Sequence, residues 1–113
     1  QYRYLVKLAE NIRVDNVLTG SAYQTAQLYY QGHSIEQICM LRNLKKSTIE
    51  DHIVELAMNE PSFEITPFVT CEDQQLVHTA VEDYATRKLK VLHEVLPHLT
   101  YFQIRLALAK GEV

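Results

Sequence analysis

The chain has 113 residues, of which 47 % are hydrophobic and 22 % are charged. This length fits one compact domain, with room for two sub-parts, and the composition excludes a disordered chain. No apolar run approaches the roughly 18 residues of a membrane-spanning helix. The formal net charge of −3 argues against nucleic-acid binding by bulk charge, so any such binding must depend on local patches of Lys and Arg.

The N-terminal residues and the cysteines indicate the compartment. The chain begins at Gln1, and residues 1–10 lack the apolar stretch and small-residue cleavage site of a signal peptide. We therefore expect a cytoplasmic segment cut from a longer protein. Cys39 and Cys71 lie far apart in the sequence. Free, buried thiols are the favoured interpretation, with a disulfide as the alternative.

A repeated helix-start pattern sets the expected secondary structure. A Ser or Thr followed three residues later by Glu, Gln or Asp lets the two side chains cap each other's backbone N–H groups. Each such pair precedes apolar residues spaced three and four apart, which is the pattern of an amphipathic helix. The pairs are Ser21/Gln24, Ser34/Gln37, Ser47/Glu50, Thr70/Asp73 and Thr100/Gln103.

In chain order, the first elements are helices joined by short connectors. The pattern predicts a helix over 2–13, with Leu5, Leu8 and Ile12 on one face, and then a connector over 15–20 that ends at Gly20. Further helices are predicted over 22–31, 35–41 and 48–59. Gly32 and Pro61 end the first and last of these, and Asn43 marks a turn.

The C-terminal part is also predicted to be helical. Residues 63–69 are expected to form an extended connector on the core, followed by helices over 72–84, 87–96 and 101–110. The predicted fold class is therefore all-α, a helix-turn-helix core with a C-terminal three-helix cap. The expected parts are an N-terminal helix and connector at 1–20, the helix-turn-helix at 21–61, and a helical part packed on it at 62–113.

The helix-turn-helix prediction rests on residues 34–58. This motif needs two steeply crossing helices with a tight turn between them, and apolar residues at fixed points of the inner face. The turn at residues 42–46 is polar except for Leu44, which is expected to plug it. The inward positions are Ile35, Ile38 and Cys39 on the first helix, and Ile49, Ile53 and Leu56 on the second.

The motif also carries a family resemblance. Ser34-Ile-Glu-Gln-Ile-Cys39 followed by Leu44-Lys-Lys-Ser-Thr-Ile-Glu-Asp-His52 resembles a helix-turn-helix at the C-terminus of some RecQ-type DNA helicases and of small bacterial proteins associated with them. Residues 21–32 are similar to that family's lead-in helix, and residues 88–96 and 99–105 look like its tail. The resemblance implies a DNA-related accessory role. It implies no helicase activity here, because a phosphate-binding Gly-rich loop with Lys is missing from the sequence.

The second helix of such a motif lies in the major groove of DNA, with its first turns facing the base edges. Lysines and hydroxyls at its start suit phosphate contacts. The acids Glu50, Asp51 and Glu55, expected on the same exposed side, would repel phosphates, unless they serve the cap, the helix dipole or solvent. The predicted nucleic-acid contacts are Arg42, Lys45, Lys46, Ser47, Thr48 and His52, with a second cluster at Arg87, Lys88 and Lys90, whose alternative is a solvated helix face.

Metal and catalytic sites are not expected. His93 and His98 are five residues apart with Pro97 between them, so they cannot share one helical face as metal ligands do. Neither cysteine has a partner histidine indicated by the sequence, and no carboxylate pair stands out. We therefore expect a non-enzyme without cofactor, metal or small-molecule substrate.

Two functions remain open at this point. The first is a module that binds DNA, or assists a RecQ-type helicase in DNA metabolism. The alternative is a protein-interaction module that docks a helicase or self-associates, which the acidic second helix and the negative net charge favour. The charge and exposure of the second helix distinguish the two.

Overall fold

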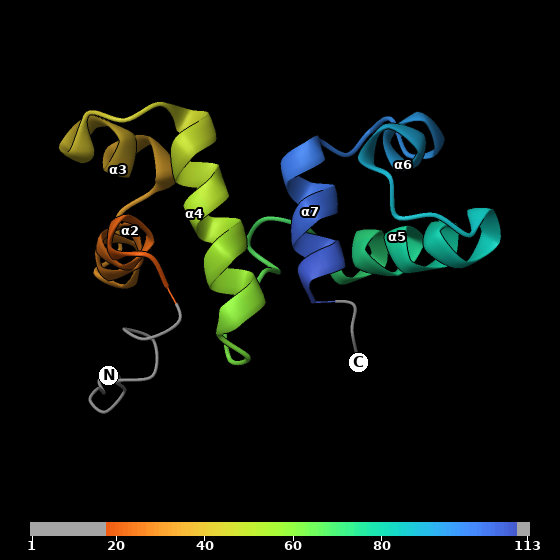
Figure 1. Cartoon of the computed structure of the whole chain (residues 1–113), viewed down its shortest axis with the longest axis horizontal. Helices are drawn as coiled ribbons and strands as arrows, with labels where there is room; N and C mark the ends of the chain where they lie inside the picture. Colours follow the sequence, from red (N-terminus) through yellow and green to blue (C-terminus); the bar gives the residue numbers. More distant parts are fainter. Residues whose placement is uncertain (1–17, 111–113) are drawn as a thin grey trace. The chain divides into compact units, whose positions relative to one another are not determined.

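A computed structural model describes residues 18–110 (Figure 1). This part of the chain contains helices and no strand, which confirms the all-α prediction. The predicted helix over 2–13 lies outside the described residues. The helices are α2 (Gly20–Tyr30), α3 (Ile35–Arg42), α4 (Lys46–Asn59), α5 (Cys71–Tyr84), α6 (Leu89–Val95) and α7 (Tyr101–Ala109).

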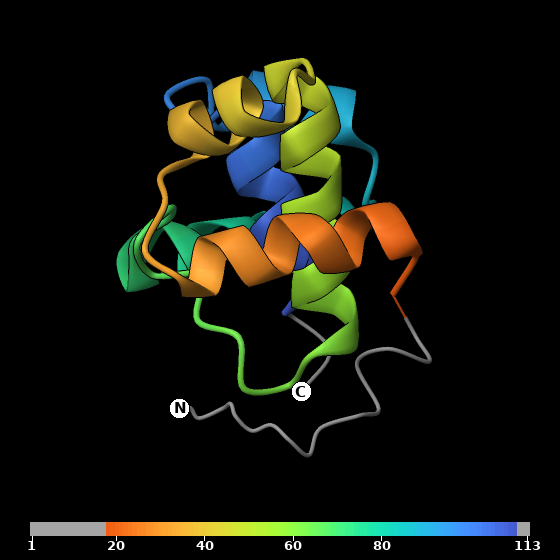
Figure 2. The ribbon, with the colours of Figure 1, turned by 90° about the vertical axis from the view of Figure 1, so that its left-hand side faces the viewer.

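The chain divides into two compact units, Gln1–Pro61 and Ser62–Val113. In the first unit, α2, α3 and α4 all pack on one another. Figure 2 shows α2 running across α4, with α3 leading into the start of α4. The predicted inward residues Ile38, Ile49, Ile53 and Leu56 are buried, while Ile35, Cys39 and Leu44 are half-buried. Burying these side chains supplies the apolar contacts that hold the three helices together.

The turn between α3 and α4 is short because Asn43 reverses the chain. Asn43 has φ 56° and ψ 48°, in the left-handed region that Asn tolerates better than most residues. Its backbone N–H donates to the carbonyl of Cys39, and the N–H of Leu44 donates to the same oxygen at 3.1 Å. The predicted turn at Asn43 is therefore confirmed.

Three of the predicted helix starts are confirmed. Ser34 and Thr100 form complete capping boxes with Gln37 and Gln103, and the Thr70 hydroxyl accepts a hydrogen bond from the N–H of Asp73.

Two predicted starts are wrong. The hydroxyl of Thr19, rather than Ser21, caps α2, so Gly20 begins that helix instead of ending a connector. Only residues 43–45 separate α3 from α4, so Ser47 lies inside α4 and Lys45 occupies the N-cap without a side-chain hydrogen bond.

The second unit has its own core between α5, α6 and α7. In the segment predicted as an extended connector, residues 63–65 have no regular structure and residues 66–69 form a turn and a bend, and Phe63, Ile65 and Val69 are buried. The helix predicted over 87–96 is shorter, because Ala85 adopts φ 52° and the chain straightens through Lys88 before α6 begins. The core residues are Val77, Ala80, Leu92, Leu99, Ile104 and Ala107.

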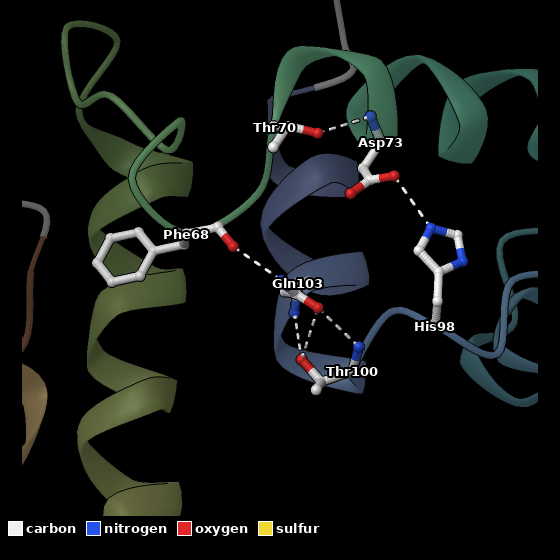
Figure 3. A network of polar contacts seen from close by, with 6 residues as sticks. All are labelled: Phe68, Thr70, Asp73, His98, Thr100 and Gln103. Carbon is white, nitrogen blue, oxygen red and sulfur yellow. Dashed lines mark hydrogen bonds and ion pairs between the residues drawn. The ribbon is translucent and has the colours of Figure 1, made fainter.

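A polar network joins the starts of α5 and α7 (Figure 3). The side-chain amide of Gln103 donates to the Phe68 carbonyl at 2.9 Å, and its oxygen accepts from the N–H of Thr100 at 2.9 Å. Close by, His98 Nε2 lies 3.0 Å from a carboxylate oxygen of Asp73. These contacts fix the segment before α5 and the α6–α7 loop. The polar side chains at this end of the second unit therefore have structural roles.

The cysteines and the helix lengths complete the description. Both thiols are free, as expected, but only Cys39 is partly buried. Cys71, the first residue of α5, is exposed. None of the helices within residues 18–110 is long and apolar enough to cross a membrane.

Candidate functional site

The start of α4 is an open polar feature of the helix-turn-helix. Lys45, Lys46 and Ser47 are exposed, and Thr48 is half-buried behind them. The first backbone N–H groups of a helix have no acceptor within the helix, and they give its start a partial positive charge. No side chain caps these groups in α4, and both lysine ammonium groups are without a hydrogen bond or ion pair to any residue between 18 and 110. The site combines backbone donors, two cations and two hydroxyls.

Arg42 does not belong to this open surface. Its Nη1 donates to the Ser21 carbonyl and to the Thr25 hydroxyl, both at 2.7 Å. Its Nη2 donates to the Ser21 hydroxyl at 3.1 Å and to Gln24 Oε1 at 3.0 Å. The guanidinium, predicted as a nucleic-acid contact, is half-buried and joins the end of α3 to α2.

His52 also faces α2 rather than solvent. Its Nδ1 lies 2.8 Å from the hydroxyl of Thr25, which is fully buried. Because the same hydroxyl accepts from Arg42, it can donate its own hydrogen to a neutral His52 ring. Burial lowers the pKa of the His52 imidazole from its usual 6.5, and the nearby Arg42 charge lowers it further, against weaker opposing effects of Glu55 and Asp51. The expected exposure of His52 on the outer face of α4 is therefore wrong.

The depressed pKa of His52 predicts how the stability of the first unit depends on pH. The unfolded chain binds a proton near pH 6.5, whereas the folded chain binds it only at lower pH. The contribution of His52 to the free energy of unfolding is fully present above about pH 6.5. It decreases as the pH falls below that value, because the unfolded chain then binds more protons at His52 than the folded chain does, by a difference of less than one proton. Amide hydrogen exchange in α2 and α4 between pH 7 and 5 measures this change.

The control is His52→Asn, whose side chain retains a polar atom near the position of Nδ1. We expect the variant to lose the part of the pH dependence that belongs to His52. Equal pH dependence in both proteins would contradict the assignment.

The three carboxylates of α4 do not all share the outer face. Glu55 Oε2 accepts a hydrogen bond from the backbone N–H of Thr19 at 2.8 Å, so this acid supports the start of α2. Asp51 is exposed and Glu50 is half-buried. Of the three acids expected to repel DNA, Glu55 is thus turned toward α2, whereas Glu50 and Asp51 remain in the second turn of α4.

The second predicted basic cluster lies in the second unit, on the connection between α5 and α6. Arg87 Nη2 donates to the Leu108 carbonyl at 3.3 Å, and the Lys88 N–H donates to the Thr86 hydroxyl at 3.1 Å. Arg87, Lys88 and Lys90 are exposed. The cluster is therefore a surface patch with one anchored arginine.

Two histidines of the second unit contact backbone carbonyls. His78 Nε2 lies 3.2 Å from the Ala107 carbonyl, and His93 Nδ1 lies 2.9 Å from the Leu99 carbonyl. Within the described part of the chain, no three His, Cys, Asp or Glu side chains are grouped as metal ligands.

Sequence reasoning missed the contacts of α2. Ser21 was expected as a cap, but it accepts hydrogen bonds from Arg42, while Glu55 serves Thr19. One signal was available, because Thr25 lies between Ala22 and Ala26 on the buried face of α2. A buried hydroxyl on an apolar face requires polar partners, although the sequence does not identify them.

Comparison with known proteins agrees with this architecture. A family model described as a helix-turn-helix domain matches residues 21–108. Protein YpbB of Bacillus subtilis (strain 168) is 42 % identical over 107 residues, which cover 94 % of this chain and 30 % of that protein. The chain thus spans less than a third of this relative's length. No solved structure shows a significant match.

Proposed function

The chain belongs to the helix-turn-helix domain family whose model covers α2 to α7, and on this premise we propose that it is a non-catalytic module that binds DNA. The contact surface is the start of α4, where Lys45, Lys46, Ser47 and Thr48 surround uncapped backbone N–H groups. The observation that carries the proposal is this uncapped, cationic helix start on the second helix of the motif. A helix in that position is the one that enters the major groove in related architectures.

The chemistry of these groups favours phosphate binding over base reading. Backbone N–H groups, ammonium groups and hydroxyls all donate to phosphate oxygens. Asp51, one turn further along α4, is exposed and acidic, and a carboxylate suits only a cytosine amino group. We therefore expect DNA binding with weak sequence preference and strong dependence on salt. Arg42 and His52 are not included in the contact surface, since both bond to α2.

In the test, the chain is titrated into labelled duplex, forked and single-stranded DNA. Fluorescence anisotropy measures the binding at several salt concentrations. A protein that neutralises two phosphates should lose affinity with a slope of log K against log salt of about −2 for duplex DNA. Undetectable binding at low salt, or an affinity that salt leaves unchanged, would exclude the proposal.

We further propose that the module assists a RecQ-type helicase. The support is the sequence resemblance over residues 21–109, which includes both the helix-turn-helix and the C-terminal segments. A purified RecQ-type helicase should unwind forked DNA faster when the chain is added. An unwinding rate that does not respond to saturating chain would contradict the accessory role.

A protein-interaction function is the second candidate, because α3 carries an exposed apolar pair. The side chains of Met40 and Leu41 are 81 % and 60 % exposed, which is unusual for neighbouring large apolar residues. A Met40→Ser/Leu41→Ser variant that retains DNA affinity but loses stimulation of the helicase would assign the pair to a protein partner. Loss of DNA affinity in that variant would instead assign it to the DNA surface.

A further inference from the structure

The lysines of the described residues differ in whether they have partners. Lys110 interacts with other residues of the chain. The ammonium groups of the remaining four make no hydrogen bond or ion pair with any residue in the range 18–110. These four form two pairs, Lys45 with Lys46 in the first unit and Lys88 with Lys90 in the second. Only the first pair belongs to the proposed DNA-contacting surface.

Lys88 of the second pair lines a shallow, open depression. Its lining residues are Val81, Ala85, Thr86, Arg87 and Lys88, and none of them is a carboxylate. The bond from Arg87 to the Leu108 carbonyl holds this guanidinium in place, which reduces the entropy lost when an anion binds beside it. The depression therefore offers positive charge over an apolar floor.

The acids of α5 nearest in sequence lie off this side of the helix, and Glu94 lies one turn after Lys90 on α6. Val81 and Ala85, one turn apart, line the depression. Successive residues of a helix are rotated by about 100°, so Asp83 lies roughly 200° around the helix from Val81, and Glu82 lies between them at the side. After Tyr84, Ala85 adopts a left-handed backbone conformation and the chain leaves the path of the helix. Arg87 and Lys88 therefore do not lie on the helical turn that carries Glu82 and Asp83.

We propose that Lys88 and Lys90, together with Arg87, form a second and separate contact to the phosphate backbone of nucleic acid. The ammonium groups of Lys88 and Lys90 have no partner within residues 18–110, Arg87 is held to the Leu108 carbonyl, and the lining contains no carboxylate, which together suit a polyanion. The apolar residues of the lining suit the sugar face of its backbone. This inference rests on the proposed function, because nucleic acid is the polyanion that a helix-turn-helix family member meets. It adds that the second unit contributes affinity of its own.

The test compares paired variants of the whole chain in the salt titration with labelled duplex DNA. Lys88→Ala/Lys90→Ala should weaken binding roughly tenfold or more at low salt and flatten the salt slope by about 2. The matched control is Gln75→Glu/Thr79→Glu, at two exposed positions of α5 that lie about 120° and about 160° around the helix from Val81. Both double variants change the net charge of −3 by two negative units, so general repulsion affects them equally.

The outcomes separate this inference from the proposed function. A larger loss for Lys88→Ala/Lys90→Ala than for the control supports the second contact. If Lys88→Ala/Lys90→Ala and the control lose the same DNA affinity, or neither loses any, the second contact is overturned. If Lys45→Ala/Lys46→Ala loses affinity in the same experiment, the start of α4 is the contact that remains. If the Lys45/Lys46 variant binds normally while the Lys88/Lys90 variant does not, the proposed surface fails and the second contact stands. Binding to phosphatidylserine vesicles but not to DNA overturns both. Equal circular-dichroism melting curves verify that the variants fold.

Discussion

Replacing Arg42 with alanine is expected to destabilise the first unit by about 2 kcal/mol, since hydrogen bonds to charged groups contribute about 1.5–3 kcal/mol each and partial exposure reduces their sum. The variant loses contacts to Ser21, Gln24 and Thr25, which join the end of α3 to α2. The buried Thr25 hydroxyl would retain only His52 as a partner. Native-state hydrogen exchange of α2 and α4 amides measures this loss separately from the second unit.

Two controls make the Arg42 prediction specific. Lys45→Ala removes a cation three residues away that has no partner among the described residues, and should change stability by less than about 0.5 kcal/mol. Arg42→Lys keeps the charge but not the planar fork, so an intermediate loss is expected. The pKa of His52 should also rise in Arg42→Ala, because a neighbouring positive charge is lost. Equal stability of Arg42→Ala and Lys45→Ala would contradict the structural role.

Replacing Lys45 and Lys46 together with alanine is expected to reduce duplex DNA affinity roughly tenfold or more at low salt and to flatten the salt slope by about 2. The reason is local, because both ammonium groups are exposed beside the uncapped start of α4. Fold stability should not change, since neither side chain has a partner within residues 18–110. Fluorescence anisotropy across a salt series measures the affinity, and thermal melting measures the stability.

The control for the lysine pair must separate local contact from net charge. Gln27→Glu/Gln31→Glu places two negative charges at exposed positions of α2 and the turn after it, and changes the net charge of −3 by the same amount. Lys45→Arg/Lys46→Arg keeps the charges and should keep most of the affinity. If the glutamate variant loses as much affinity as the alanine variant, the effect is general repulsion and the contact surface lies elsewhere.

The fold was largely predictable because helix starts and apolar spacing are local properties. Ser34 and Thr100 were identified as caps because each hydroxyl lies three residues before a glutamine that completes the box. Ser47 shows the same pattern, but the short turn after α3 places it inside α4. A local pattern allows several helix registers, and tertiary packing selects one of them.

The site was less predictable because it depends on contacts between distant residues. Arg42 and His52 look like exposed polar groups of a recognition surface, yet both bond to Thr25, 17 and 27 residues earlier in the chain. Glu55 looks like an acid on the outer face, but it reaches Thr19, 36 residues away. Such partners follow from how α2 crosses α4, which helical periodicity alone does not specify.

The central claim, that the start of α4 is the DNA-contacting surface, is tested most directly by nuclear magnetic resonance. Duplex DNA is titrated into the ¹⁵N-labelled chain, and the backbone amide shifts are followed residue by residue. The account predicts that the largest changes occur at Lys46 and Ser47, whose N–H groups lie in the uncapped first turn, and smaller ones at Thr48, whose N–H donates to the Lys45 carbonyl. Unchanged shifts at these residues, or changes concentrated at Met40 and Leu41 of α3, would contradict it.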